Sequence, residues 1–268
     1  MSELKEFLIV GLDSLFRWMH ILAGILWIGL LYFFNWVNGA VMATLDAETK
    51  KKVVPEIMPR TLYWFRWGAA WTWITGVFLL LLVFYHGGQL LDGADQTWSV
   101  GTMVMVAFTF LGVFLYDALF KSPLGKTNKV GGSIGFVLIA VTLYLMDTWG
   151  GFSYRGYIIH VGALFGTIMA FNVWYRIWPA QQRIIRAIKD GNAPIGADVA
   201  MAGGRSKHNT YLSVPLVWAM INSHTSYFAG ANLGIPSGYA WVGFLVVTLL
   251  GWHIVWHLYR RSTKVKGF

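Results

Sequence analysis

The sequence predicts an all-α integral membrane protein, a bundle of seven transmembrane helices with a periplasmic N-terminus and a cytoplasmic C-terminus. Composition is the first indication: 56% of the 268 residues are hydrophobic and 12% are charged, whereas soluble domains carry about 25% charged residues. The second is a series of long apolar segments, and the third is the gathering of basic residues on one side of them. Fifteen tryptophans also suit side chains at membrane–water interfaces.

The apolar segments define the helices. A bilayer core requires roughly 20 residues of helix, and we expect a single transmembrane domain over residues 1–268. The first segment begins behind acidic residues instead of the positive charge of a cleavable signal peptide, so it is expected to be retained. The seven predicted spans are 12–37, 63–85, 99–120, 132–149, 155–178, 210–229 and 238–259.

The basic residues orient these spans. Of the 21 lysines and arginines, 18 lie in or beside 38–62, 120–131, 179–209 and the C-terminal tail, and only Lys5, Arg17 and Arg155 lie on the other side. Cytoplasmic loops carry such an excess, which places those four segments inside. The net charge of +9 therefore indicates anionic lipid and not nucleic acid as the partner of the basic residues.

Only one predicted connection, 179–209, is long. Its first part, PAQQRIIRAIKDG, has the pattern of a short amphipathic helix lying on the inner membrane surface, with Ile184, Ile185 and Ile188 toward lipid. The small and Gly-rich stretch that follows, NAPIGADVAMAGGR, is expected to be irregular.

Several classes of function are excluded. The chain has no cysteine, which removes disulfides, iron–sulfur clusters and covalent c-type haem within it. No lysine lies inside the last span, as a retinal protein requires, and there is no zinc-protease signature. Asp13, Asp117 and Asp147 lie near span ends and not at the midplane where a charge-coupled transporter needs carboxylates.

Histidines inside the membrane are the main functional signal. His20, His160 and His224 fall on different spans but at one depth, roughly 8–12 Å below the outer surface at 1.5 Å per residue. Ionisable groups at such a depth are costly and mark functional sites. Imidazoles that face each other across a bundle can ligate a b-type haem, although each histidine could instead hydrogen-bond across helices as packing.

Residues near these histidines favour haem. Arg17, His20, Gly24 and Trp27 share one helical stripe, on which Gly24 leaves room for a porphyrin edge. Arg17 precedes His20 by three positions and Arg155 precedes His160 by five. Both guanidinium groups are candidates to bind haem propionates facing the periplasm, or they are ordinary interfacial arginines.

A second haem is possible at the inner side. His253 and His257 lie one turn apart on the last span and His208 lies at the inner end of the sixth. The Trp-rich run of the second span, Trp64, Trp67, Trp71 and Trp73, could flank a porphyrin or form an interfacial belt. We therefore expect one or two b-type haems.

Three long stretches carry a family resemblance: RWMHILAGILWIG in the first span, HVGALFGTIMAFNVWYRIWPAQQR from His160 to Arg183, and SKHNTYLSVPLVWAMINSHTSYFAG from Ser206 to Gly230. They resemble the bacterial membrane-bound urate oxidase family, which couples to cytochrome c, and the likeness covers nearly the whole chain. The resemblance implies a protein of the bacterial inner membrane that oxidises urate toward 5-hydroxyisourate with an electron acceptor other than oxygen.

The same resemblance suggests how substrate is held and where electrons go. Polar candidates to orient a purine are His208, Asn209, Tyr211, Asn222 and Asn172. Family members assigned as urate oxidases carry a further helix and a C-terminal cytochrome c, whereas this sequence ends after the seventh span and has no cysteine. The acceptor is therefore expected to be a separate c-type cytochrome or respiratory subunit.

Three functions remain open from sequence. The first is a urate dehydrogenase, which rests on the family resemblance. The second is a non-catalytic haem b subunit that transfers electrons, with quinone as a possible reactant, in a larger respiratory complex. The third is a structural or transport subunit in which the histidines only pack.

Overall fold

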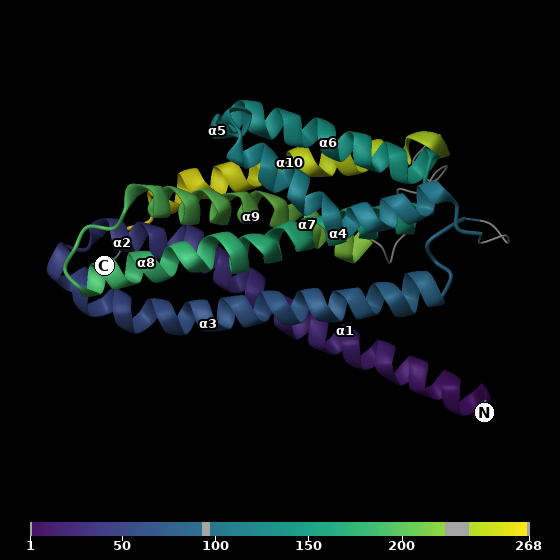
Figure 1. Ribbon diagram of the computed structural model, residues 1–268, viewed down its shortest axis with the longest axis horizontal. Helices are drawn as coiled ribbons and strands as arrows, with labels where there is room; N and C mark the ends of the chain where they lie inside the picture. The colour runs from purple at the N-terminus through teal and green to yellow at the C-terminus, as the bar shows by residue number, and fades with distance from the viewer. Residues whose placement is uncertain (1, 93–96, 223–235, 267–268) are drawn as a thin grey trace. The chain divides into compact units, whose positions relative to one another are not determined.

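The computed structural model describes residues 2–92, 97–222 and 236–266, and within these ranges it contains helices and no strand (Figure 1). The elements follow the chain as α1 (Ser2–Tyr32), η1 (Phe33–Asn38), α2 (Gly39–Thr44), α3 (Ala47–Leu79), η2 (Leu80–His86), α4 (Val100–Lys121), α5 (Pro123–Lys126), α6 (Asn128–Thr148), α7 (Tyr154–Phe171), η3 (Asn172–Ile177), α8 (Trp178–Lys189), α9 (Gly196–Asn222), η5 (Ser237–Tyr239) and α10 (Ala240–Ser262).

Six helical segments of the described chain are long and apolar enough to cross a membrane, which makes this a multi-pass membrane protein: Phe7–Thr44, Ala47–His86, Val100–Lys121, Lys129–Thr148, Tyr154–Lys189 and Ala240–Ser262. They match six of the seven predicted spans. The predicted span 210–229 is helical as far as Asn222, and its remainder lies outside the described residues. The seventh span and the orientation stay predictions.

Two predicted loops are largely helical. In 38–62 only Leu45 and Asp46 interrupt the helix, because Asp46 accepts hydrogen bonds from the backbone N–H (2.9 Å) and hydroxyl (2.7 Å) of Thr49 and so caps the start of α3. In 179–209 the predicted amphipathic helix is present as α8, but it continues α7 without a break. The stretch predicted to be irregular is so only over 192–195, and the prediction was wrong from Gly196 onward, where α9 begins.

The chain forms two compact units. One comprises Met1–Val77, Met169–Ser213 and Trp252–Phe268, and the other comprises Phe78–Ile168 and Val214–Gly251. Each therefore combines segments from distant parts of the sequence. On the described spans other than Tyr154–Lys189, large apolar side chains such as Ile25, Leu111, Val137 and Leu250 are exposed, as expected for helices that face lipid.

In the first unit α1 and α3 approach closely at a glycine. A Cβ added to Gly68 of α3 would lie 3.3 Å from the backbone nitrogen of Trp27, which is itself 2% exposed. Small residues at such crossings allow helices to pack in a membrane without a hydrophobic driving force between them. The crossing fixes the face of α1 that carries His20, one helical turn before Gly24.

In the second unit hydrogen bonds join the start of α4 to the residues that follow α6. Ser99 and Thr102 form a capping box that begins α4, and the Thr102 hydroxyl also donates to the Gly150 carbonyl at 2.8 Å. Gly101 must lack a side chain, because a Cβ there would lie 2.2 Å from the carbonyl oxygen of Trp149. These contacts order the chain immediately before α7.

Candidate functional site

In the described part of the chain three short π-helical segments lie within the spans: η1, η2 and η3. A π-helical turn accommodates an extra residue in an α-helix and is often found at functional sites, because it turns a side chain away from its α-helical direction. Here the segments carry Asn35, Tyr85 and Asn172, each of which hydrogen-bonds to a side chain on another part of the chain.

The most connected of these side chains is Asn35, in the first unit. Its amide nitrogen donates to the hydroxyl of Ser206 at 2.8 Å and to the carbonyl of Leu31 at 2.9 Å, while its amide oxygen accepts from the hydroxyl of Tyr259 at 2.8 Å. One residue on η1 thus joins Ser206 inside α9 to Tyr259 near the end of α10. We call Asn35, Ser206, Lys207, Tyr211 and Tyr259 the Asn35 cluster.

Aromatic rings surround this amide. The rings of Tyr211 and Tyr259 are nearly parallel, 18° apart with centroids separated by 6.1 Å. The Lys207 ammonium lies 5.5 Å from the Tyr259 ring centroid, within cation–π range. The cluster therefore combines flat apolar faces, one positive charge and amide and hydroxyl groups, a set of groups that can bind a planar, polar anion.

A second pair of amide side chains joins α9 to η3. Asn172, the first residue of η3, donates to the Asn209 amide oxygen at 2.8 Å, and the Asn209 amide nitrogen donates to the Met169 carbonyl at 3.0 Å. Both asparagines are fully buried. Buried amides so bonded hold one geometry, so these two predicted substrate-binding residues also hold α9 against η3.

His208 lies between the two amide systems, just before the predicted sixth span. Its pKa is lowered to about 4, because burial disfavours the charged ring and the positive charges of Arg205 and Lys207 add to the effect. The imidazole is therefore neutral at physiological pH.

His160 occupies the core of the second unit. Its Nδ1 lies 2.7 Å from the carbonyl oxygen of Gly156, so Nδ1 carries the proton, and Nε2 accepts from the hydroxyl of Tyr85 on η2 at 3.0 Å. The ring is fully buried, with Phe84 and Phe152 packed edge-on against it. Ser153 positions this end of α7, since its hydroxyl donates to the Gln89 carbonyl at 2.8 Å.

His20 in the first unit is held in a similar way. Its Nδ1 lies 3.2 Å from the hydroxyl of Thr75 on α3. A Cβ added to Gly76 would approach the ring to 3.0 Å, so only glycine leaves space for it there. In both His20 and His160 the chain holds Nδ1, as is usual for a metal-ligating histidine, but Nε2 of His160 is already hydrogen-bonded to Tyr85.

Arg17 and Arg155, the two arginines predicted to bind haem propionates, differ in their ion pairing. Arg17 is paired with Asp13, its Nε 2.8 Å from the carboxylate, whereas Arg155 is partly buried and has no ion-pair partner among the described residues. Arg155 thus keeps its charge available to an anion near His160. A Cβ at Gly24 would lie 3.8 Å from a methyl of Thr72, so this face of α1 packs on α3, and Trp27 belongs to that helix contact.

The histidines proposed for an inner haem contact each other. His253 Nε2 lies 3.0 Å from His257 Nε2, and both side chains are exposed on α10 beside Trp256. Asn222 is buried at the end of described α9, and His224 lies outside the described residues. No group of three or more His, Asp or Glu side chains suited to a metal ion occurs in the described ranges.

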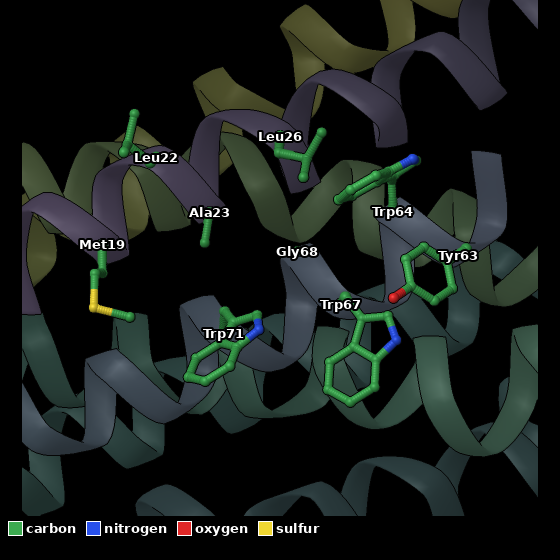
Figure 2. Close-up of a pocket in the computed structure, with 9 residues that line it drawn as sticks. All are labelled: Met19, Leu22, Ala23, Leu26, Tyr63, Trp64, Trp67, Gly68 and Trp71. Atoms are coloured by element: carbon green, nitrogen blue, oxygen red, sulfur yellow. The ribbon is translucent and has the colours of Figure 1, made fainter. Parts of the chain in front are cut away.

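Tryptophans of α3 line an apolar cleft of about 460 Å³ against α1 (Figure 2). Trp64, Trp67 and Trp71 follow one another along α3, and Met19 and Leu26 are among the α1 residues on the other side. None of the nine lining residues is a histidine, so the cleft contains none of the predicted haem ligands. Trp73 is not part of it.

Comparison with known proteins identifies the family of this chain. The model of the urate oxidase N-terminal family matches residues 46–267. The chain belongs to this family. Neither the curated proteins nor the solved structures contain a match. The family match includes α9 and α10 with four members of the Asn35 cluster, and it confirms the resemblance seen in the sequence: this is a urate-oxidase-like membrane module.

Sequence reasoning missed Asn35, Tyr85 and Tyr259. An asparagine at position 35 stands in an otherwise apolar span, and polar residues inside a span are costly and functional by default, so this signal was present. Tyr85 and Tyr259 lie near span ends, where tyrosines are common in interfacial belts. Their roles follow only from the π-helical turn and from the helix that faces them.

Proposed function

We propose that this chain is the membrane module of a redox system that oxidises urate, holds b-type haem and passes electrons to a cytochrome c or another respiratory partner. The family match over residues 46–267 carries the proposal. The Asn35 cluster supports it, because the cluster combines aromatic faces with a cation and amide groups in the way a purine anion requires.

In this proposal the cluster binds and orients urate. The purine stacks on Tyr211 or Tyr259, Lys207 offsets its negative charge, and the amide of Asn35 and hydroxyl of Tyr259 bond its polar edge. Insertion between the two rings would require a separation of about 7 Å, twice a ring contact of about 3.5 Å, compared with 6.1 Å between centroids here. The neutral His208 is the candidate general base.

The reaction balances without oxygen. Urate and water give 5-hydroxyisourate, two protons and two electrons, so water supplies the new hydroxyl and an acceptor must take both electrons. His208 can pass a proton on to water, since its low pKa prevents the ring from keeping it. The acceptor is the partner protein, reached through haem.

The histidines fit haem. His20 in one unit and His160 in the other are each candidates to hold a haem through Nε2, with Nδ1 kept in place by Thr75 and Gly156 respectively, and Arg155 would bind a propionate near His160. A haem so held accepts and passes single electrons. Tyr85 would have to release Nε2 of His160 for this.

An optical spectrum of the purified protein, oxidised and reduced, with haem quantified per chain, tests the redox half. We expect b-type haem, and we expect His20→Ala or His160→Ala to abolish or shift the Soret band. A protein without haem contradicts the redox proposal and favours a structural subunit. Haem with unaltered spectra in both variants contradicts the ligand assignment.

Loss of urate absorbance with oxidised cytochrome c as acceptor tests the catalytic half. Tyr259→Phe removes the hydroxyl that bonds Asn35, and we expect it to slow urate oxidation about tenfold. Tyr175→Phe, at a tyrosine 65% exposed, is the matched control and should oxidise urate as the wild type does. A haem-containing protein that never consumes urate would instead be a non-catalytic electron-transfer subunit.

A further inference from the structure

A groove of about 900 Å³ lies in the first unit between the start of α3 and α8. Its walls come from the two segments, 38–62 and 179–209, that the sequence predicts to be cytoplasmic. The prediction that three isoleucines of α8 face lipid was wrong in part, because Ile185 is buried. Ile184 and Ile188 line this groove.

The groove is apolar along its walls. Met42, Val54 and Met58 line it on the side of α2 and α3, opposite Ile184 and Ile188 of α8. A strip of this kind suits a hydrocarbon chain, because burial of apolar surface stabilises it by roughly 25 cal/mol per Å². The salt bridge from Arg183 of α8 to Asp198 of α9, with Nε to Oδ2 at 2.9 Å, holds the α8 wall.

Its charge is positive at the rim. Lys50 and Lys51 line the groove and have no ion-pair partner among the described residues, whereas Lys52 lies outside it and pairs with Glu48 at 2.8 Å. Glu48 is the one acidic lining residue and is thus offset. The Lys51 ammonium reaches across to Gly191, where an added Cβ would lie 3.1 Å from Nζ.

We propose that this groove binds an acidic phospholipid of the surrounding bilayer. Lys50 and Lys51 hold the phosphate of the headgroup, and one acyl chain lies between α3 and α8. Charge complementarity favours this occupant over a zwitterionic lipid, and anionic lipids gather where basic residues face the cytoplasmic leaflet. The site is independent of urate oxidation, since it shares no residue with the Asn35 cluster.

Native mass spectrometry of the full chain in detergent, titrated with phosphatidylglycerol or phosphatidylcholine, tests the proposal. We expect phosphatidylglycerol to bind and Lys50→Gln/Lys51→Gln to weaken it about fivefold for each lysine removed. Ala43→Phe, which fills the groove without changing charge, should also weaken binding. Lys126→Gln/Lys129→Gln removes the same charge from exposed positions outside the groove and should bind as the wild type.

Three results would overturn the proposal: equal binding of phosphatidylcholine, equal loss in the Lys126 and Lys129 control, or unchanged binding in the Lys50 and Lys51 variant. Competition by inorganic phosphate as strong as by phosphatidylglycerol would show a simple anion site, which also contradicts a lipid groove. Circular dichroism of each variant establishes that it is folded.

Discussion

Replacement of buried amide side chains is expected to destabilise this fold strongly. Asn172 and Asn209 are both fully buried, and Asn209 joins η3 to α9 through its oxygen and nitrogen at once. Replacing Asn209 by alanine leaves the Asn172 amide nitrogen without its acceptor and the Met169 carbonyl without its donor. A buried polar group deprived of its partner costs about 1–3 kcal/mol.

We therefore expect Asn209→Ala to lower the free energy of unfolding by about 2 kcal/mol or more, measured by denaturant titration in detergent. Asn192→Ala, at an exposed position, is the control and should change little. Equal stability of the two variants would show that the amide pair contributes nothing.

The neutral state of His208 leads to a pH dependence. Its folded pKa is lowered to about 4 from an ordinary value near 6.5, so below pH 6.5 the unfolded chain binds a proton that the folded chain does not. The stability that depends on the neutral His208 ring is therefore fully present above about pH 6.5. It is lost as pH falls toward 4, where the free energy of unfolding decreases by at most about 1.4 kcal/mol per pH unit.

Unfolding of wild type and His208→Gln between pH 7.5 and 5 measures this effect. The wild type should lose more stability on acidification than the variant does. His253→Gln, at an exposed histidine, should retain the wild-type slope. A wild-type slope in His208→Gln would mean that other groups cause the acid sensitivity.

At the level of elements, the π-helical turns decide which side chains reach the sites. Deleting one residue from η1, such as the exposed Phe33, should restore an α-helix and turn Asn35 away from Ser206 and Tyr259. We expect helix content by circular dichroism to be unchanged and urate oxidation to be lost. Val37→Ala, at another exposed position of η1, should remain active; an active deletion variant would mean that the turn is dispensable.

The helices themselves could be predicted from sequence, because apolar run length reports directly on the bilayer. The extensions of the helices beyond the membrane could not be predicted. The stretch 47–62 resembles a loop because it contains Glu48 and Lys50, and 196–209 does so because of the glycines near Gly203. Tertiary packing overrides such weak propensities. The π-helical turns leave no compositional mark, which is why Asn35 and Tyr85 were missed, whereas His160 and Asn209 were named as candidates from their residue type and position. Which histidines ligate haem still rests on prediction.

For the whole molecule, the distribution of basic residues predicts orientation, and the absence of cysteine makes it testable by single substitutions. Gln89→Cys, before α4, is expected outside the cell, and Ser122→Cys, after α4, inside. A membrane-impermeant maleimide applied to intact cells should label the first and not the second, and both after lysis. The reverse pattern would invert the predicted topology.

The distance between His20 and Asn35 has a consequence for energy coupling. They lie fifteen residues apart on the continuous helix of α1 and η1, roughly 22 Å at 1.5 Å per residue, which is most of the hydrocarbon thickness of about 30 Å. Electrons released from urate near Asn35 and collected near His20 would move outward across the membrane dielectric. A negative-inside potential would drive them, by about 2.3 kcal/mol per charge and 100 mV for a full crossing. In sealed vesicles of native orientation, collapsing the potential with an ionophore should therefore slow the reduction of external cytochrome c by urate.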